Sequence, residues 1–557
     1  MYSFHAYFPI LLFLLVFLAT FALPIGAYKV LIFSQTFTRS HVMLNARVAQ
    51  TLAVDGHNVT IVEVEFIEPL ANFSGSVARG VRKIGVSGQH MEAGKEQWAQ
   101  LLHETLKPWT AWKMLTNAWG ERNEKLQRVF NSACEKFVDG NGDLLEALKG
   151  DQFDLFIGGQ INFCGSALSQ LLAIPVHVLL ASCPLQEHVT SVFGLHSPSS
   201  YVPSIYGVAY TDKMSLFERF VNSIAQKIYE NVFVYGMDDL TTKFRRKFGF
   251  GVLEKDQLRS VREIVRESPL VFVNVDEFTD FPRPLFPNFI FIGGLELEGT
   301  PELKALQEPY KSELLKGRKG VVFFSMGSAV KTDVLPAPFM KNVIGAFAEL
   351  PDWHFIVKIE PDDEQSRRMA ENVPNIRLTS WAPQPAILSH PRLRLFITHG
   401  GYNSLLEGAQ SGTPVLSIGF FADQRRNALV AQRNGWGRAF ENWKLLEGMN
   451  EFRETVREML EEDNEQLSRA AKRVKTILAT KPFSARDKLT KYIRFLEQNG
   501  GRLPELMSEA RNLTAIELYG IDLVLLTFGG LLALIAVVLA LFWMLCHNLK
   551  TKKRKNE

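Results

Sequence analysis

The most informative shortages in this sequence of 557 residues are of cysteine and of familiar binding motifs. The four cysteines (Cys134, Cys164, Cys183 and Cys546) are too few for a disulfide scaffold and form neither a CxxC pair nor a cluster with metal-ligand spacing. There is no DxD pair, no GxGxxG fingerprint, no internal repeat and no low-complexity segment. A net charge of +3, part of it at the extreme C-terminus, offers no extended basic face to nucleic acid.

What the chain does have is a long apolar run near each end. Residues 7–22 are apolar and precede small residues, which predicts a signal peptide over residues 1–27. A membrane anchor is the alternative, because no Lys or Arg precedes the run. Residues 521–546 carry one charge, Asp522, and are long enough to cross a bilayer core of roughly 30 Å. The basic tail, residues 547–557, is then cytosolic by the positive-inside rule, and everything before residue 521 is lumenal.

This single-pass, type I topology has consequences for modification and location. Asn58, Asn72 and Asn512 begin glycosylation triplets that the lumen would expose to the modifying machinery. Three of the four cysteines are lumenal, so at least one is unpaired within the chain. The ending Lys553-Arg-Lys resembles a dilysine-type retrieval signal, which predicts the endoplasmic reticulum membrane; a basic stop-transfer flank is the alternative.

Between the two ends, apolar strand-like runs alternate with helical periods in two sets. The first set predicts a domain over residues 28–285 and the second a domain over residues 286–500, with a proline-rich linker at 281–295 and a juxtamembrane segment at 501–520. The charged helical segment from 452 to about 498 is expected to return and pack across the two domains. We interpret the aromatic stretch 186–251 as the wall of an acceptor pocket. The fold class is therefore α/β, with two doubly wound parallel-sheet domains facing a cleft and sites at the carboxyl ends of the strands.

The stretch FITHGGYNSLLEG, residues 396–408, ends an apolar strand in a histidine and two glycines and then opens a helix. A helix N-terminus favours an anion, and glycines let a phosphate approach the backbone. His399 can donate to a diphosphate, and Glu407 one turn later suits the hydroxyls of a ribose. The spacing indicates a nucleotide diphosphate site; a plain turn capped by Asn403 or Ser404 is the alternative.

Neighbouring segments favour the nucleotide interpretation. Trp381 offers a flat face for a base and Gln384 can bond at its edge, while Asp423 and Gln424 suit sugar hydroxyls. The run from 381 to 424 resembles the donor-binding signature of the UDP-glycosyltransferases, which include the UDP-glucuronosyltransferases. The segments VVFFSMGS and FPRPLFPNFIFIGGL, the span and the basic tail also match the animal enzymes. The resemblance implies the glycosyltransferase type B (GT-B) fold with a C-terminal transmembrane helix.

The resemblance also implies a role for each residue of the donor site. Uracil would stack on Trp381 beside Gln384, the ribose would bind Glu407, the diphosphate would lie on Ser328, His399 and Ser404 with Gly401 and Asn403 in the family's register, and the sugar would bind Asp423 and Gln424. It implies no metal and no cofactor beyond UDP-glucose or UDP-glucuronate as co-substrate, and a small lipophilic acceptor. Self-association or association with other members is possible for membrane-tethered proteins of this family.

The family's general base is a histidine on the first loop of the N-terminal domain, and His41 occupies that place. At a helix start its charged form is disfavoured, so it can act as a neutral base. The family supports this histidine with a carboxylate after the strand that follows FD. Gly159 stands at that position, with Gln160 and Asn162 nearby and no Asp or Glu from 158 to 185. Either another group supports His41 or the member is slow.

A second departure concerns the donor sugar. The vertebrate glucuronosyl enzymes carry an arginine a few residues before FPRP, where Asn274 stands here, and a neutral amide favours glucose over glucuronate. The leading hypothesis is an inverting, metal-independent transferase that moves a hexose from a UDP-sugar to a lipophilic hydroxyl compound. The alternative is an inactive UDP-sugar-binding homologue that regulates partner transferases, which Gly159 favours. A transporter is disfavoured because one span cannot make a pathway.

Overall fold

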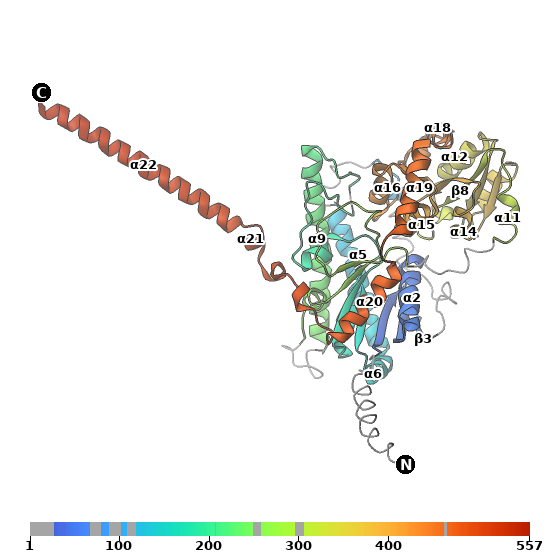
Figure 1. Ribbon diagram of the computed structural model, residues 1–557, viewed down its shortest axis with the longest axis horizontal. Helices are drawn as coiled ribbons and strands as arrows, with labels where there is room; N and C mark the ends of the chain where they lie inside the picture. Colours follow the sequence, from blue (N-terminus) through green and yellow to red (C-terminus); the bar gives the residue numbers. More distant parts are fainter. Residues whose placement is uncertain are drawn as a thin grey trace, which may run out of the picture.

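The computed structural model describes residues 27–66, 80–87, 102–108, 118–206, 208–248, 258–295, 306–461 and 465–556. Almost all of the predicted signal peptide and the acceptor Asn72 lie outside these residues. The remaining chain forms two α/β units and a long C-terminal helix that projects from them (Figure 1).

The first unit is built on a parallel sheet in the order β3-β2-β1-β4-β5-β6-β7. Its strands are β1 (Lys29–Gln35), β2 (Asn58–Val64), β3 (Val81–Val86), β4 (Leu155–Gly159), β5 (Val176–Ala181), β6 (Val271–Val273) and β7 (Phe289–Phe291). The chain reverses direction across the sheet between β1 and β4, so the loops after these two strands meet at one point. Ligands of doubly wound sheets bind at such a point.

Helices cover both faces because the central strands are apolar on both. They are α2 (Arg39–Val54), α5 (Ala118–Gly140), α6 (Gly142–Gly150), α7 (Cys164–Leu171), α8 (Glu187–Val192), α9 (Leu216–Phe248) and α10 (Val261–Arg266). Ile32 and Ile157 pack with Leu44 and Val48 of α2 on one face, as strand alternation requires. Gly56 has φ 104° just beyond α2, as the sequence predicts for a glycine that ends a helix.

The predicted linker contains a strand of the first sheet. β7 pairs with β6 from Val271 opposite Phe289 to Val273 opposite Phe291. The first sheet therefore runs past residue 285, where the sequence suggested that the first domain ends. The three prolines in this stretch obscured a strand of three residues, since prolines normally mark non-strand segments.

The second unit is built on a parallel sheet in the order β10-β9-β8-β11-β12-β13. Its strands are β8 (Gly320–Ser325), β9 (Trp353–Lys358), β10 (Ile376–Thr379), β11 (Leu393–Thr398), β12 (Val415–Ser417) and β13 (Gly437–Ala439). Its helices are α11 (Tyr310–Glu313), α12 (Ala337–Ala348), α13 (Glu364–Ala370), α14 (Gln384–Leu388), α15 (Tyr402–Ser411), α16 (Gln424–Arg433), α17 (Lys444–Glu447), α18 (Asn450–Leu460) and α19 (Glu465–Thr480). This arrangement, two facing doubly wound sheets, confirms the predicted fold class.

The chain returns to the first unit before it leaves the body. Ala471 and Val474 of α19 pack in the core beside α15, whereas Leu489 and Ile493 of α20 (Ala485–Gln498) pack on the first sheet with Ile32. The two units are thus linked twice by the chain. Cys134 of α5 and Cys164 of α7 form a disulfide, which leaves Cys183 and Cys546 free.

After α20 come α21 (Ala515–Leu518) and α22 (Ile521–Asn556), the projecting helix of Figure 1. Residues Ile521–Lys552 are apolar and long enough to cross a membrane, and no part of their most apolar window is buried. This fits a single-pass membrane anchor. The helix continues past residue 546, where the sequence placed the end of the span, because the basic tail has no residue that breaks a helix.

Candidate active site

The donor motif lies at the carboxyl edge of the second sheet, where the loops after β8 and β11 meet. Gly327 and Gly400 have φ of 71° and 81°, a region open to glycine. A Cβ atom on Gly327 or on Gly401 would lie 2.4 Å from the ring of His399. The imidazole is therefore held between two glycines, at the start of α15. Ser328 stands in the turn that follows Gly327.

Burial, and then the positive charge of Lys358, lower the pKa of His399 to about 4. His399 is thus neutral at pH 7 and can meet an anion only as a hydrogen-bond donor rather than as a charge. Lys358 ends β9, and its Nζ donates to the carbonyl of Gly327 at 2.8 Å. This lysine supplies the positive charge beside the motif. Sequence reasoning missed it, because a lysine at a strand end has no distinctive spacing.

A hydrogen-bonded set joins α14 to α15. Gln384 Nε2 donates to Glu407 Oε2 at 2.7 Å and lies 3.3 Å from Ser404 Oγ. Burial raises the pKa of Glu407 to about 7, and the bond from Gln384 acts against this rise. Trp381, just before this set, is 60% exposed, so its indole face is open to a flat ligand. The structure thus gathers the four residues that the sequence assigned to a nucleoside and its first phosphate.

Asn403 makes a contact that the sequence did not anticipate. Its Oδ1 accepts from Asn274 Nδ2 at 2.7 Å, across the two units. Asn274 also donates to the carbonyl of Ser182 at 3.2 Å and is only 1% exposed. The position at which sequence reasoning expected a sugar-reading residue is therefore a buried amide that holds the two units together.

Asp423 and Gln424 lie at the next strand-to-helix turn. Asn427 Nδ2 donates to Asp423 Oδ2 at 2.7 Å and to the carbonyl of Gly400 at 3.1 Å, which ties this turn to the donor motif. Burial raises the pKa of Asp423, and the bond from Asn427 opposes the rise. Gln424 Oε1 accepts from the backbone N–H of Phe420 at 2.9 Å, so the carboxamide oxygen braces the turn.

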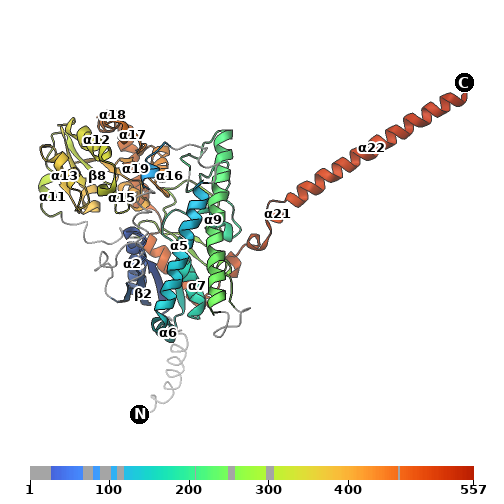
Figure 2. The same ribbon diagram turned by 180° about the vertical axis from the view of Figure 1, so that it is seen from behind.

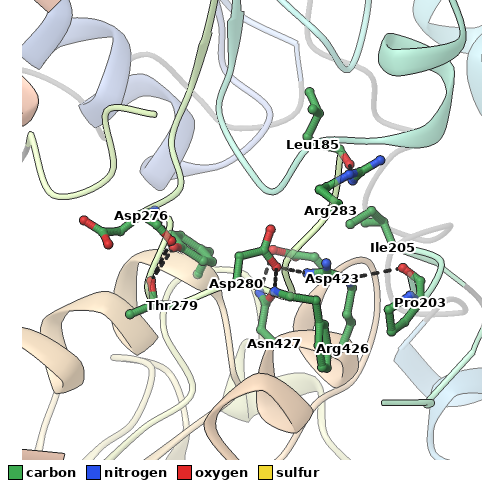
Figure 3. Close-up of polar contacts among 12 residues, drawn as sticks. Leu185, Pro203, Ile205, Asp276, Thr279, Asp280, Arg283, Asp423, Arg426 and Asn427 are labelled. Carbon is green, nitrogen blue, oxygen red and sulfur yellow. Dashed lines mark hydrogen bonds and ion pairs between the residues drawn. The ribbon is translucent and has the colours of Figure 1, made fainter. Parts of the chain in front are cut away.

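Beside this turn, a buried ion pair crosses between the units (Figure 3). Arg426 Nη1 bonds Asp280 Oδ1, with the side chains 0% and 6% exposed. The guanidinium also lies 5.0 Å from the centre of the Phe281 ring. Asp423 is one turn away on the same segment, so the pair sets the position of the sugar-side residues relative to the first unit. Sequence reasoning missed it because the partners are 146 positions apart.

His41 lies in the first turn of α2, partly buried against Phe37. Its Nδ1 is 2.6 Å from Thr38 Oγ1, which in turn is 2.9 Å from Ser40 Oγ. Burial lowers the pKa of His41 to about 4. Within the described residues, no carboxylate forms an ion pair or hydrogen bond with His41. The group that orients the imidazole is therefore the Thr38 hydroxyl.

At Gly159, where the family would place the supporting carboxylate, the structure has room for a side chain. A Cβ atom added there would meet nothing within 4 Å. Ile157 of β4 pairs with Ile32, and Gly159 lies two residues farther along β4, on the same face of the strand as Ile157. Ser34 Oγ accepts from Asn45 of α2 at 2.9 Å, one turn after His41. A side chain at 159 would thus point to the face on which α2 packs.

The two edges face each other across the units. Arg39, the first residue of α2, is close enough to Lys358 to contribute to the lowering of its pKa, although burial is the larger cause. Lys358 acts in the same way on His399. The start of α2, with His41, therefore lies opposite the donor motif.

Of the predicted glycosylation positions that the structure describes, Asn58 begins β2 and Asn512 ends a short 3-10 turn, and both are exposed. Each side chain is accessible to the modifying machinery.

Two facing parallel sheets, with a glycine-bounded histidine and an open tryptophan at one edge, define a glycosyltransferase of the GT-B class. Solved structures agree on the fold. A UDP-glucose:anthocyanidin 3-O-glucosyltransferase in complex with UDP has a TM-score of 0.57 at 16% identity, covering 85% of this chain and 99% of that one. The calicheamicin glycosyltransferase CalG4 has a TM-score of 0.52 at 17% identity, covering 86% and 100%.

The chain belongs to the UDP-glucoronosyl and UDP-glucosyl transferase family, which it matches over residues 28–556. This confirms the resemblance seen in the sequence. The Caenorhabditis elegans protein ugt-47, which carries a UDP-glucuronosyltransferase name, is 34% identical over 505 residues, covering 90% of each chain. Rattus norvegicus UDP-glucuronosyltransferase 2B1 is 29% identical, covering 74% of this chain and 75% of the relative.

Proposed function

We propose that this glycosyltransferase moves glucose from UDP-glucose to the hydroxyl group of a small lipophilic acceptor, with inversion at the anomeric carbon. The observation that carries the proposal is the arrangement of the two facing edges: His41 on one, and the set of Trp381, Gln384, Glu407 and His399 on the other. A base and a nucleotide-diphosphate site opposite each other are what a direct displacement needs.

In the proposed reaction, an acceptor oxygen attacks the anomeric carbon while its proton passes to His41 Nε2. The bond between that carbon and the β-phosphate oxygen breaks, and UDP leaves with the bonding electrons. Thr38 accepts a hydrogen bond from Nδ1, which leaves the lone pair of Nε2 for the proton. The charge that grows on UDP is met by the N-terminus of α15 and by Lys358. The proposed reaction uses no metal and no cofactor.

The choice of glucose over glucuronate rests on charge. Asn274 is neutral, buried and bonded to Asn403. The guanidinium of Arg426, three residues after Asp423, is paired with Asp280. A glucuronate carboxylate would therefore have to compete with Asp280 for its cation, whereas the hydroxyls of glucose need only Asp423 and Gln424.

A second candidate, a homologue that binds UDP-sugars without turnover, is favoured by one observation. His41 is supported by a hydroxyl rather than a carboxylate, so the imidazolium that forms in the reaction has no counter-charge.

One experiment separates the two. The full chain in vesicles is incubated with UDP-glucose or UDP-glucuronate and a panel of phenols, and UDP release is measured beside calorimetric binding of UDP. The transferase predicts UDP release with UDP-glucose that is lost in His41→Ala while UDP binding is kept. The same background release from the wild type and His41→Ala, with UDP still bound, would leave the non-catalytic homologue.

We also propose that the body is lumenal in the endoplasmic reticulum. The basic tail after the apolar helix supports this, because positive residues mark the cytosolic end of a span. Asn58 and Asn512 are exposed, so a lumenal body could carry glycans at both positions. Removal of all three acceptors, Asn58, Asn72 and Asn512, should abolish the mobility shift that an endoglycosidase produces on the protein from membranes. A shift that persists in Asn58→Gln/Asn72→Gln/Asn512→Gln, or protein that never carries one, contradicts this topology.

A further inference from the structure

The first turns of α9 carry an apolar patch that the fold does not use. Leu216, Phe217 and Phe220 are 77%, 58% and 57% exposed, and we call these three the α9 patch. Within the described part of the body before residue 500, no other three large apolar side chains are so exposed within five consecutive positions. A patch of this kind on a soluble surface marks a site of contact with another apolar phase.

The opposite face of the same helix segment is fully occupied. Val221, Ala225 and Tyr229 are buried against Val208. Asn222 Nδ2 donates to the carbonyls of Ser199 and Val202 at 2.8 and 2.9 Å. The helix is therefore held in place from within, and the α9 patch is a fixed outer surface.

The juxtamembrane segment is fastened to α9 just below the patch. Lys227 Nζ lies 5.9 Å from the ring centre of Tyr519, and the His196 ring lies 5.0 Å from the same ring. In the loop between α8 and α9, a Cβ on Gly194 would lie 2.3 Å from the backbone of Ala510, so this loop and the juxtamembrane segment are in direct backbone contact. Lys227 is two turns, about 10 Å, from Phe220 along the helix.

The direction of α22 places the patch on the membrane side of the body. α22 leaves the body beside α9, and it slopes toward the side on which the N-terminal end of α9 lies, in both views (Figures 1 and 2). The rest of the first unit lies farther from the path of α22. A bilayer that α22 crosses therefore passes close to the Leu216 end of α9 and far from α2.

We propose that the α9 patch inserts into the headgroup boundary of the bilayer that α22 spans, as a second and peripheral membrane contact. Exposed leucine and phenylalanine side chains at a helix end suit this boundary. Lys213 and Arg219 flank the patch and are exposed, where each can contact lipid phosphate while its stem lies along the apolar surface. The contact would fix the orientation of the two α/β units relative to the membrane, which a single spanning helix alone would leave free.

The test uses the full chain in vesicles of phosphatidylcholine and phosphatidylserine. A photoactivatable p-benzoylphenylalanine replaces Phe217, and adducts with lipid are measured by mass. In the matched control the same probe replaces Val54, which is 66% exposed at the end of α2. In the positive control the probe replaces Leu523 of α22, which is 64% exposed. We expect a lipid-adduct yield at 217 about fivefold or more above that at 54.

A second variant separates docking from chance encounter. With the probe at 217, Leu216→Ser/Phe220→Ser should lower the lipid-adduct yield to that at 54, while the melting temperature stays unchanged because both side chains are exposed. Equal yields at 217 and 54 overturn the proposal. So does an adduct between two protein chains at 217, which would make the patch an interface between copies, and so does an unchanged yield in the double variant.

Discussion

The open space at Gly159 allows a carboxylate to be returned to His41. Gly159→Asp introduces a side chain that meets no atom within 4 Å at its Cβ, on a strand residue without positive φ. By strand alternation this side chain shares the face of Ile157, against which α2 packs. The substitution should therefore fold and should place a negative charge on the side of the sheet that carries His41.

The expected size follows from the electrostatics of His41. Its pKa is lowered to about 4 by burial alone. A carboxylate within 4–6 Å raises such a pKa by about one to three units. If the transition state for proton transfer gains about half of that stabilisation, the turnover number rises by roughly 3- to 30-fold.

The assay is the pH dependence of kcat/KM for UDP release, with Gly159→Asn as the neutral control of similar shape. His41 must be unprotonated to act, so the wild-type rate should fall as the pH drops through about 4, and the Asp variant should show this fall about one to three units higher. A folded Gly159→Asp with the pH profile and turnover of Gly159→Asn would refute the role of His41 as the base.

Two further outcomes test the donor site and the contact between the units. Because the pKa of Glu407 is raised to about 7, UDP should bind about tenfold more weakly at pH 6 than at pH 8 by calorimetry, and Glu407→Gln should lose the part of this dependence due to the carboxylate. Asp280→Asn, which leaves Arg426 buried without its partner, should cost about 3–5 kcal/mol, or roughly 3–5 °C of melting temperature for a body of this size, whereas Arg426→Met/Asp280→Asn should recover most of it. Breaking the exposed pair with Arg318→Ala, which frees Asp352, should change the melting temperature far less, because water screens the pair, and a similar loss at both pairs would contradict the reasoning.

Much of the fold could be predicted from the sequence because its signals are local. Apolar runs on both faces indicate central parallel strands, and the sequence placed the carboxyl edges correctly. The short strand β7 was missed because a strand of three residues, preceded by three prolines, is too short to show a hydrophobic period. The sequence indicated that the last helices of the body pack across the two domains, but not that α20 covers the first sheet, since an amphipathic helix does not specify which of two sheets it covers.

For the candidate site, local spacing was enough to name the residues but not their partners. The order of His399, Glu407 and Asp423 along the chain indicated a nucleotide-sugar site, because His399 directly follows a strand, Glu407 lies on the next helix and Asp423 stands at the next strand-to-helix turn. That Thr38 orients His41 could have been noticed from a spacing of three at a helix start. The role of Lys358 could not have been noticed, because this lysine at the end of β9 contacts Gly327 in the loop after a different strand, β8.

The sequence by itself determined two doubly wound units, a C-terminal apolar helix and the family to which the chain belongs, because periodicity, turn chemistry and motif spacing act over a few residues. Only the tertiary structure decided how the units meet. Asn274 bonds Asn403 over 129 positions and Arg426 bonds Asp280 over 146. Such pairs depend on how two separately built sheets dock, and docking is a property of shaped surfaces that no local pattern encodes.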